Sequence, residues 1–397
     1  MREMNFFGDD AVKLDILKKR AFNGRWAEVG EGVIPLTAAD PDFQVDPKVI
    51  GAMRDYLDGG YLSYTPKLGF PEFRQAIADG INARKNEGVK ADLVLPLDSA
   101  ARGMYVIAAA FLRPGDEMIV FDPVDYLFKD SCLAAGGVPV RFPARPGPDG
   151  KGLELGDLES YITPKTRMIG LCNPHNPWGT LYTKADLEHI LALANKYHLW
   201  IMNDEIWSDI VYPEQPFLSI NQVEGDKRQV VSVYGFSKSF GVAGLRIGCV
   251  YCSDQEVFDA IVQESAVMTT AGGICSISQV AGTACMRQGF ERLDAFLVHL
   301  RQNRDYALER LAHLDGVTCR KPQATYLLFP DITGTGLSSQ EFAAFMEREV
   351  KLAIVPGTEK FFGPGAEGHI RICFATSRAI LKEGLDRLER GMELLRH

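Results

Sequence analysis

Seven short apolar segments, several separated by longer amphipathic ones, constrain the fold of this chain more than any other feature. Their ranges are 92–97, 117–121, 137–142, 168–172, 199–203, 230–234 and 247–252. Short apolar runs of this kind are typical of strands that are buried on both faces. Helical patterns such as 99–112 and 184–197 lie between several of them. Because parallel strands need crossover connections, which are usually helices, this order predicts an α/β fold with a mostly parallel, seven-stranded sheet flanked by helices.

The character of the sequence changes past about residue 285. Helical patterns then alternate with short apolar segments, at 290–314, 324–329, 338–349, 369–374 and 377–395. This alternation predicts a smaller α+β C-terminal domain. We therefore expect three regions: an N-terminal segment, residues 1–45, that packs with the small domain; a large domain, residues 46–285; and the small domain, residues 286–397.

Composition and charge narrow the classes of partner. The chain has 397 residues, a formal net charge of −9 and a pI near 5.4, so we expect neither nucleic acid nor a membrane as a partner. The first ten residues lack the apolar core of a signal peptide. Most of the eight cysteines lie in apolar runs, which is typical of free thiols in a reducing cytoplasm. Cys249 and Cys252 would point to opposite faces of one strand, so we expect no metal site.

The stretch from Gly235 to Gly248 follows a predicted strand and contains Lys238 between two serines. A lysine amine can form a Schiff base with an aldehyde cofactor, and Ser237 and Arg246 are suited to hold a phosphate group. A lysine flanked by serines is more often an exposed loop residue, so the assignment depends on the rest of the chain. The stretch predicts a site for a phosphorylated aldehyde.

Three further groups of polar residues or amides follow predicted strands. They are Ser99 with Ala100 and Ala101, Asn176, and Asp204. The first group begins a helix, where exposed amides and the helix dipole attract an anion. Taken singly, the three groups would be only an N-cap, a turn and a capping aspartate. Because ligands of parallel sheets bind outside the carboxyl ends of the strands, we expect all three to form one site with Lys238.

The pattern Ser-Lys-x-Phe-x-x-x-Gly-x-Arg-x-Gly around Lys238 resembles the cofactor-lysine motif of the fold-type I enzymes that use pyridoxal 5'-phosphate (PLP), the aminotransferase class I/II superfamily. Residues 173–179 are similar to its N-P-x-N-P-x-G motif, and Tyr64 matches its Tyr-x-x-x-x-Gly. The resemblance extends from Asp40 to Phe374. It looks closest to the branch of cystathionine β-lyase-like C–S lyases and related aminotransferases, through segments such as 204–210.

The resemblance implies catalytic roles for two residues. Lys238 would hold PLP as an aldimine and remove the substrate Cα proton to give a quinonoid, and Asp204 would keep the ring nitrogen protonated. The large domain would then be the PLP-binding domain. The residues implied to contact PLP are Ser99, Ala100, Ala101, Tyr126, Asn176, Asp204, Ser237, Lys238, Arg246 and Tyr64.

The same resemblance implies the partners. Arg371 would bind the α-carboxylate of an amino acid or keto acid, with Asn176 and Trp207 also lining the substrate site. Tyr64 would reach the phosphate held by the neighbouring subunit. The resemblance therefore implies a homodimer with a shared active site.

Two positions depart from the family's pattern. Relatives carry Pro-x-Tyr, with the tyrosine stacked on the cofactor ring, where this chain has Pro123-Val-Asp125. Tyr126 or Phe128 would have to replace that tyrosine, or the ring face is more polar. Trp207 stands where aminotransferases usually have tyrosine and the C–S lyase branch has histidine.

The resemblance predicts a PLP-dependent aminotransferase acting on an L-amino acid. A C–S β-lyase, or another elimination or replacement enzyme, is the alternative, since these reactions share their early steps. A degenerate PLP-binding regulatory protein is a third possibility. It is disfavoured because every side chain that Schiff-base chemistry needs is present.

Overall fold

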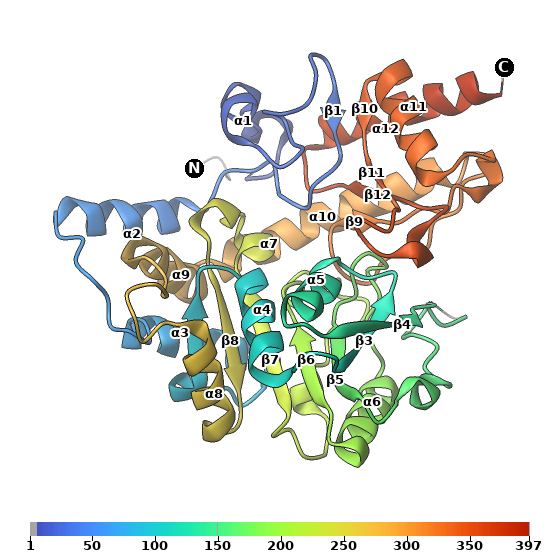
Figure 1. Ribbon diagram of the computed structural model, residues 1–397. Helices are drawn as coiled ribbons and strands as arrows, with labels where there is room; N and C mark the ends of the chain where they lie inside the picture. The colour runs from blue at the N-terminus through green and yellow to red at the C-terminus, as the bar shows by residue number, and fades with distance from the viewer. Residues whose placement is uncertain (1–5, 149, 397) are drawn as a thin grey trace.

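A seven-stranded sheet forms the centre of the fold (Figure 1). The computed structural model describes residues 6–148 and 150–396, and the strand order in this sheet is β2-β8-β7-β6-β5-β3-β4. The strands are β2 Val94–Leu97, β3 Glu117–Asp122, β4 Val138–Pro143, β5 Thr166–Cys172, β6 Trp200–Asp204, β7 Val230–Gly235 and β8 Gly248–Cys252. Only β8 runs antiparallel to its neighbours, β2 and β7. The predicted mostly parallel sheet is confirmed.

Helices cover both faces of this sheet, which explains why its strands are apolar at nearly every position. In β3, Met118 packs in the cluster that contains side chains of α4 (Ala100–Phe111), α5 (Leu127–Ala134) and α8 (Gln255–Ser265). Ile119 packs on the other face, in the cluster that contains side chains of α6 (Lys184–Tyr197). Cys249 and Cys252 likewise belong to clusters on different faces, as strand alternation predicts.

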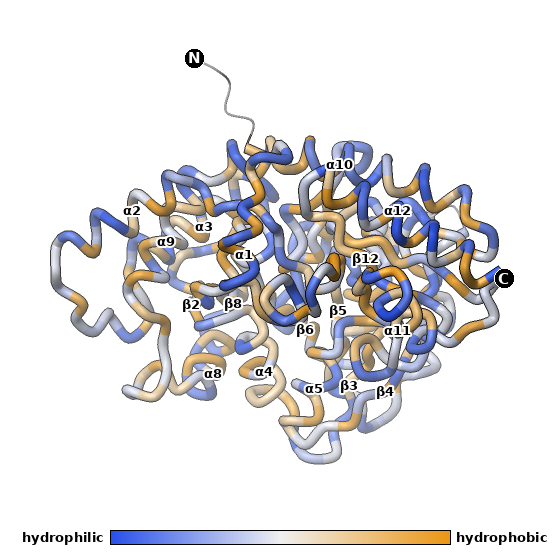
Figure 2. The backbone as a smooth tube through the Cα atoms, turned by 90° about the horizontal axis from the view of Figure 1, so that it is seen from above, coloured by the Kyte–Doolittle hydropathy of each residue, from blue (hydrophilic) through white to orange (hydrophobic). Residues whose placement is uncertain are grey.

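The helices are α1 Leu14–Arg20, α2 Pro47–Asp58, α3 Pro71–Lys85, α4 Ala100–Phe111, α5 Leu127–Ala134, α6 Lys184–Tyr197, α7 Ser237–Phe240, α8 Gln255–Ser265, α9 Ser276–Gln288, α10 Phe290–Leu311, α11 Ser339–Val350 and α12 Arg378–Leu395. Local chemistry fixes several starts: Thr183 and Asp186 form a capping box at α6, and Ser377 caps α12. Hydrophilic and hydrophobic residues alternate along α10 and α12 (Figure 2). Among the described helices, none is long and apolar enough to cross a bilayer.

The C-terminal elements lie beyond the carboxyl ends of the parallel strands (Figure 1). The remaining strands are β1 Ile34–Pro35, β9 Leu327–Leu328, β10 Leu352–Ala353, β11 Val355–Pro356 and β12 Ile370–Cys373. Three of them form a small sheet with the order β11-β12-β9, and β1 pairs in parallel with β10. The N-terminal segment therefore contributes a strand to the C-terminal part of the chain.

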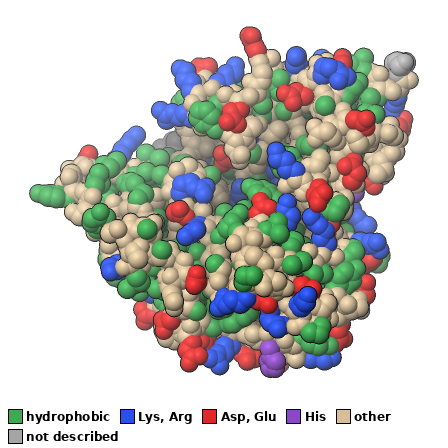
Figure 3. All heavy atoms as spheres, viewed as in Figure 1, with side chains coloured by type: hydrophobic (Ala, Val, Ile, Leu, Met, Phe, Trp, Pro, Cys, Tyr) green, Lys and Arg blue, Asp and Glu red, His purple; other side chains and the backbone are tan. Residues whose placement is uncertain are grey.

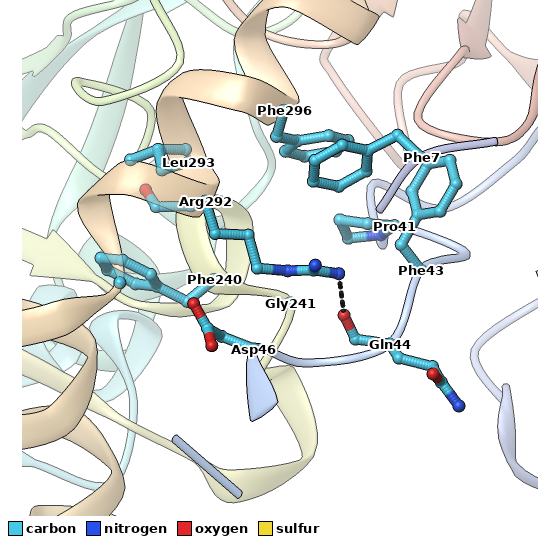
Figure 4. A pocket seen from close by; sticks show the side chains of 12 residues that line it. Phe7, Pro41, Phe43, Gln44, Asp46, Phe240, Gly241, Arg292, Leu293 and Phe296 are labelled. Carbon is cyan, nitrogen blue, oxygen red and sulfur yellow. Dashed lines mark hydrogen bonds between the residues drawn. The ribbon is translucent and has the colours of Figure 1, made fainter. Parts of the chain in front are cut away.

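The loop at 38–46 is fixed at three points. Arg25 Nη2 and Trp26 Nε1 both donate to Asp42 Oδ1, at 2.5 and 2.8 Å. Arg292 on α10 donates to the carbonyl oxygen of Gln44 at 2.6 Å (Figure 4). The side chains of Arg25 and Asp42 are each only 2% exposed, so their ion pair lies in the interior. These contacts hold the loop against α10.

Asp42→Asn should lower the free energy of unfolding by about 3 kcal/mol, because it leaves the buried Arg25 guanidinium without its counter-charge. Chemical denaturation of the purified protein measures this value. Glu291→Gln, which breaks the exposed pair with Lys48, is the matched control and should leave stability nearly unchanged. An equal loss of stability in both variants would contradict the conclusion that the buried Arg25–Asp42 pair stabilises the fold.

Candidate active site

Three neighbouring strands bring one group of candidate residues together. Leu97 at the end of β2 and Gly235 at the end of β7 both pair with Gly248 at the start of β8. Ser99, Ser237 and Arg246 each lie two residues beyond this line, and therefore leave the sheet at the same edge. This is the carboxyl edge of the parallel strands, where ligands of such sheets bind.

The start of α4 is shaped to hold an anion. The Ser99 hydroxyl accepts a hydrogen bond from Arg102 N at 3.0 Å, whereas the first-turn amides of Ala100 and Ala101 have no acceptor within their own helix. Gly248 passes so close to Ala100 N that a Cβ at position 248 would overlap with it. The glycine therefore lets the start of α4 pack closely against β8, at the same edge where Ser237 and Arg246 leave the sheet.

Lys238 lies in the short helix α7, and its Nζ donates to Ala39 O at 2.8 Å. The Trp207 ring lies 5.7 Å from Nζ. Burial lowers the pKa of Lys238, and Arg371 lowers it further, while Asp40 acts in the opposite direction. Lys238 is thus a lysine whose neutral, nucleophilic form is favoured.

Asp204 ends β6, in register with Cys172 of β5. Burial raises its pKa to about 7, although Ile206 N donates to Oδ1 at 2.9 Å and Lys238 acts to lower the value. A buried carboxylate in this state gains from a cationic partner. A protonated ring nitrogen would be such a partner.

Asn176 is 4% exposed, and its Nδ2 donates to Asp125 Oδ2 at 2.9 Å. Among the described residues, Asn176 Oδ1 has no hydrogen-bond partner. Asp125 Oδ1 accepts from Leu127 N at 3.1 Å, which fixes the carboxylate at the turn before α5. Asp125 therefore lies inside the candidate site, next to the asparagine that the family uses at the cofactor.

Arg371 on β12 brings the C-terminal sheet into the site. Its Nε is buried and has no hydrogen-bond partner in the described part of the chain, although the guanidinium lies 5.1 Å from the centre of the Phe362 ring. An unpaired guanidinium donor near Lys238 is suited to a carboxylate ligand.

The turn after β3 differs from the expectation at one position. Phe128 is fully buried in the core, against Gly170, so the interpretation of Phe128 as a ring-stacking residue is wrong. Phe128 lies on the face of α5 that packs against the core. The sequence analysis did not predict α5, so it could not assign Phe128 to that face. Tyr126 lies just before α5, is 42% exposed, and stays a predicted cofactor contact.

Trp207, Tyr64 and the neighbouring motif residue His175 lie in different surroundings. Trp207 is buried, with its ring 4.6 Å from that of Tyr326. Tyr64 projects into solvent with 93% of its surface exposed. His175 is buried, and burial lowers its pKa to about 3, so this side chain is a neutral structural residue at neutral pH.

Two groups in the site were given no role by the sequence motifs. Ala39 O is the acceptor for both Lys238 Nζ and the Tyr326 hydroxyl, and the Asp40 carboxylate acts on the pKa of Lys238. Residues 39–43 belong to the family resemblance, but no periodicity relates them to Lys238. Only the fold places them there.

These side chains fit PLP. The start of α4, the lysine with a lowered pKa, and Asp204, which forms no ion pair among the described residues, match the phosphate, aldehyde and ring nitrogen of that cofactor. The described residues contain no group of three or more histidine, cysteine, aspartate or glutamate side chains that could hold a metal ion.

Comparisons with known proteins agree with this chemistry. The family described as "Aminotransferase class I and II" matches residues 31–388. Aromatic-amino-acid aminotransferase 2 of Thermococcus litoralis is 30% identical over 91% of this chain and 92% of its own length. Aspartate aminotransferase of Pyrococcus abyssi is also 30% identical, over 90% of this chain and 91% of that protein.

Cystalysin from Treponema denticola, a structure that contains PLP, superposes with a TM-score of 0.88. It is 20% identical over 95% of this chain and 97% of its own, which is a likeness of fold alone. The cystathionine β-lyase-like branch is therefore not confirmed. The family match and the named relatives confirm the predicted cofactor and the predicted reaction class. The chain belongs to the aminotransferase class I and II family and is a PLP-dependent aminotransferase.

Proposed function

We propose that Lys238 binds PLP covalently and moves the Cα proton of an L-amino acid. The observation that carries this proposal is the convergence of Lys238, Asp204 and Arg371 at one edge of the sheet. When bound, PLP serves as an electron sink for the bonds at Cα. The lowered pKa of Lys238 favours the amine that accepts the proton.

The other residues would bind and orient. Asp204 would hold a proton on the ring nitrogen, and Asn176 would donate to the ring's phenolic oxygen through Nδ2. Arg371 would take the α-carboxylate of the amino acid and then of the keto acid. The residues proposed to hold the phosphate are Ser99, Ala100, Ala101, Ser237 and Arg246.

Trp207 favours transamination over elimination. Transamination needs one base that removes a proton from one atom and returns it to another, and Lys238 can do both. The indole of Trp207 can donate a hydrogen bond but cannot transfer protons as a histidine would. Its ring near Lys238 Nζ would instead exclude water from the amine.

We also propose that residues 46–285 form the PLP-binding domain and that residues 1–45 pack with the small domain, 286–397. The parallel pairing of β1 with β10 supports this division. The eight cysteines are free, and six of them are buried, which supports a cytoplasmic location.

A homodimer with shared active sites is the proposed assembly. Apolar side chains are exposed along the end of α2 and the loop after it, including Leu57, Tyr61, Leu62 and Tyr64. They line or flank a groove whose other wall is residues 267–277, and hydrophobic side chains gather on this flank, at the left of Figure 3. A surface of this kind is typical of a protein interface. A second copy seated there would bring Tyr64 to its neighbour.

Lys238→Ala should lower kcat by about 10³-fold or more, because it removes the amine that holds the cofactor and moves the proton. The visible absorbance that PLP gains from its bond to the lysine should disappear as well. Keto acid formation from a panel of amino acids measures turnover. The exposed Lys184→Ala is the control, and normal turnover by Lys238→Ala would refute the proposal.

Arg371→Gln should raise the KM for amino acids by about 10- to 100-fold, because the substrate carboxylate loses a charge-assisted contact. The cofactor should stay bound. Steady-state kinetics and PLP absorbance separate these effects. Arg390→Gln, which changes an exposed arginine, should do neither. An unchanged KM would rule out Arg371 as the carboxylate ligand.

Tyr64→Ala and Lys238→Ala should complement each other. In a mixed dimer one of the two sites would contain both native residues, so random mixing should restore about a quarter of the native sites. Activity is measured after the two inactive variants are unfolded and refolded together. A mixture no more active than the average of the two pure variants would exclude a shared site.

A further inference from the structure

The Asp125 carboxylate lies among the groups that would bind substrate. Its Oδ2 accepts from Asn176 Nδ2 at 2.9 Å. Arg371 and Lys238 both act electrostatically on Asp125, and Asp125 acts on Asp204. The relatives' tyrosine would cover the cofactor ring at this position, whereas an aspartate brings a negative charge.

Backbone hydrogen bonds fix the turn that carries Asp125. Val124 N donates to Phe362 O at 2.9 Å, and Tyr126 N donates to Phe361 O at 3.1 Å. These bonds join the turn after β3 to the C-terminal part of the chain, close to Arg371, whose guanidinium faces the Phe362 ring. Asp125 therefore has a defined position and is not a mobile surface carboxylate.

The charges around Lys238 do not balance once a substrate is bound. The carboxylates Asp40, Asp125 and Asp204 interact electrostatically with Lys238 or Arg371. A third cation, Arg25, also acts on Asp40, but its charge is matched by the ion pair with Asp42. In the proposed function, the ring nitrogen pairs with Asp204, the substrate carboxylate occupies Arg371, and Lys238 acts as a neutral amine. Among the described residues, Asp125 is then left without a cationic partner. Its side chain is half-buried, and desolvation raises its pKa, so an unpaired charge there is unfavourable.

We propose that Asp125 is a specificity-determining residue that selects amino acids with a cationic nitrogen on the side chain. This inference rests on the proposed function, since it requires that Arg371 take the α-carboxylate. A side-chain amine, guanidinium or imidazolium would restore the charge balance and pair with Asp125 Oδ2. A side-chain carboxylate would add a negative charge beside Asp125 and is rejected for that reason.

The test compares substrates that differ in the charge of the side chain. L-Norleucine is L-lysine without its terminal ammonium group, and L-glutamine has a neutral amide where L-glutamate has a carboxylate. L-Arginine and L-histidine distinguish guanidinium and imidazolium from amine. The kcat/KM values are measured for the native holoenzyme, Asp125→Asn and Asp125→Glu. Asp130→Asn is the matched control. It removes a carboxylate from α5, the helix that follows Asp125, where Asp130 Oδ1 lies 3.4 Å from Lys129 Nζ.

The native enzyme and the Asp130→Asn control should prefer L-lysine to L-norleucine by about tenfold or more. Asp125→Asn should abolish this preference and raise the use of L-glutamate relative to L-glutamine by about tenfold, and Asp125→Glu should keep part of the preference. Calorimetric binding of α-methyl-L-lysine and α-methyl-L-norleucine, which have no Cα proton to lose, should follow the same order.

Two results would overturn the inference in different ways. In the first, the holoenzyme transaminates neutral or acidic amino acids, and Asp125→Asn leaves the lysine-to-norleucine ratios of kcat/KM and of binding unchanged. Asp125 then does not select the substrate, while the proposed function stands. If no amino acid reacts although PLP absorbance and folding are normal, the proposed function fails and the inference fails with it.

Discussion

Burial of ionisable groups at the carboxyl edge of the sheet is the constraint on which the site depends. Desolvation lowers the pKa of Lys238 and raises the pKa of Asp204 to about 7. Both changes favour the uncharged forms. A cationic group of a ligand would reverse the change at Asp204, and an aldehyde would react with the uncharged amine of Lys238. An aldehyde, a phosphate and a protonated ring nitrogen in one molecule satisfy the lysine, the α4 helix start and the aspartate together.

The fold keeps this edge buried by covering it with segments from both ends of the chain. The loop at 38–46 reaches Lys238 through Ala39 O, and the Arg25–Asp42 pair and Arg292 hold the loop in place. The C-terminal sheet contributes Arg371 from the opposite side. Without these covers the lysine would be solvated, and its pKa would lie nearer to that of a free lysine.

The family match defines the reaction class but not the side chain that the substrate carries. The relatives described above are named for aromatic amino acids and for aspartate. A half-buried carboxylate at position 125 would change the electrostatics of the pocket without changing the groups proposed to act on Cα. Backbone hydrogen bonds from Val124 and Tyr126 hold the turn after β3, and they do not depend on the side chain at position 125. A change at this position can therefore alter the substrate while the fold and the reaction class stay the same.

The sequence by itself determined the sheet and its strand ends, because burial on both faces leaves continuous apolar runs that are local in the sequence. It also determined which polar residues leave those ends, among them Asp204, Asn176 and Lys238. It did not determine how the turn after β3 distributes its side chains: Phe128 enters the core, whereas Asp125 turns toward Asn176. Nor could it place Ala39 and Asp40 beside Lys238. These contacts join segments about 50 to 200 residues apart, so only packing in three dimensions decides them.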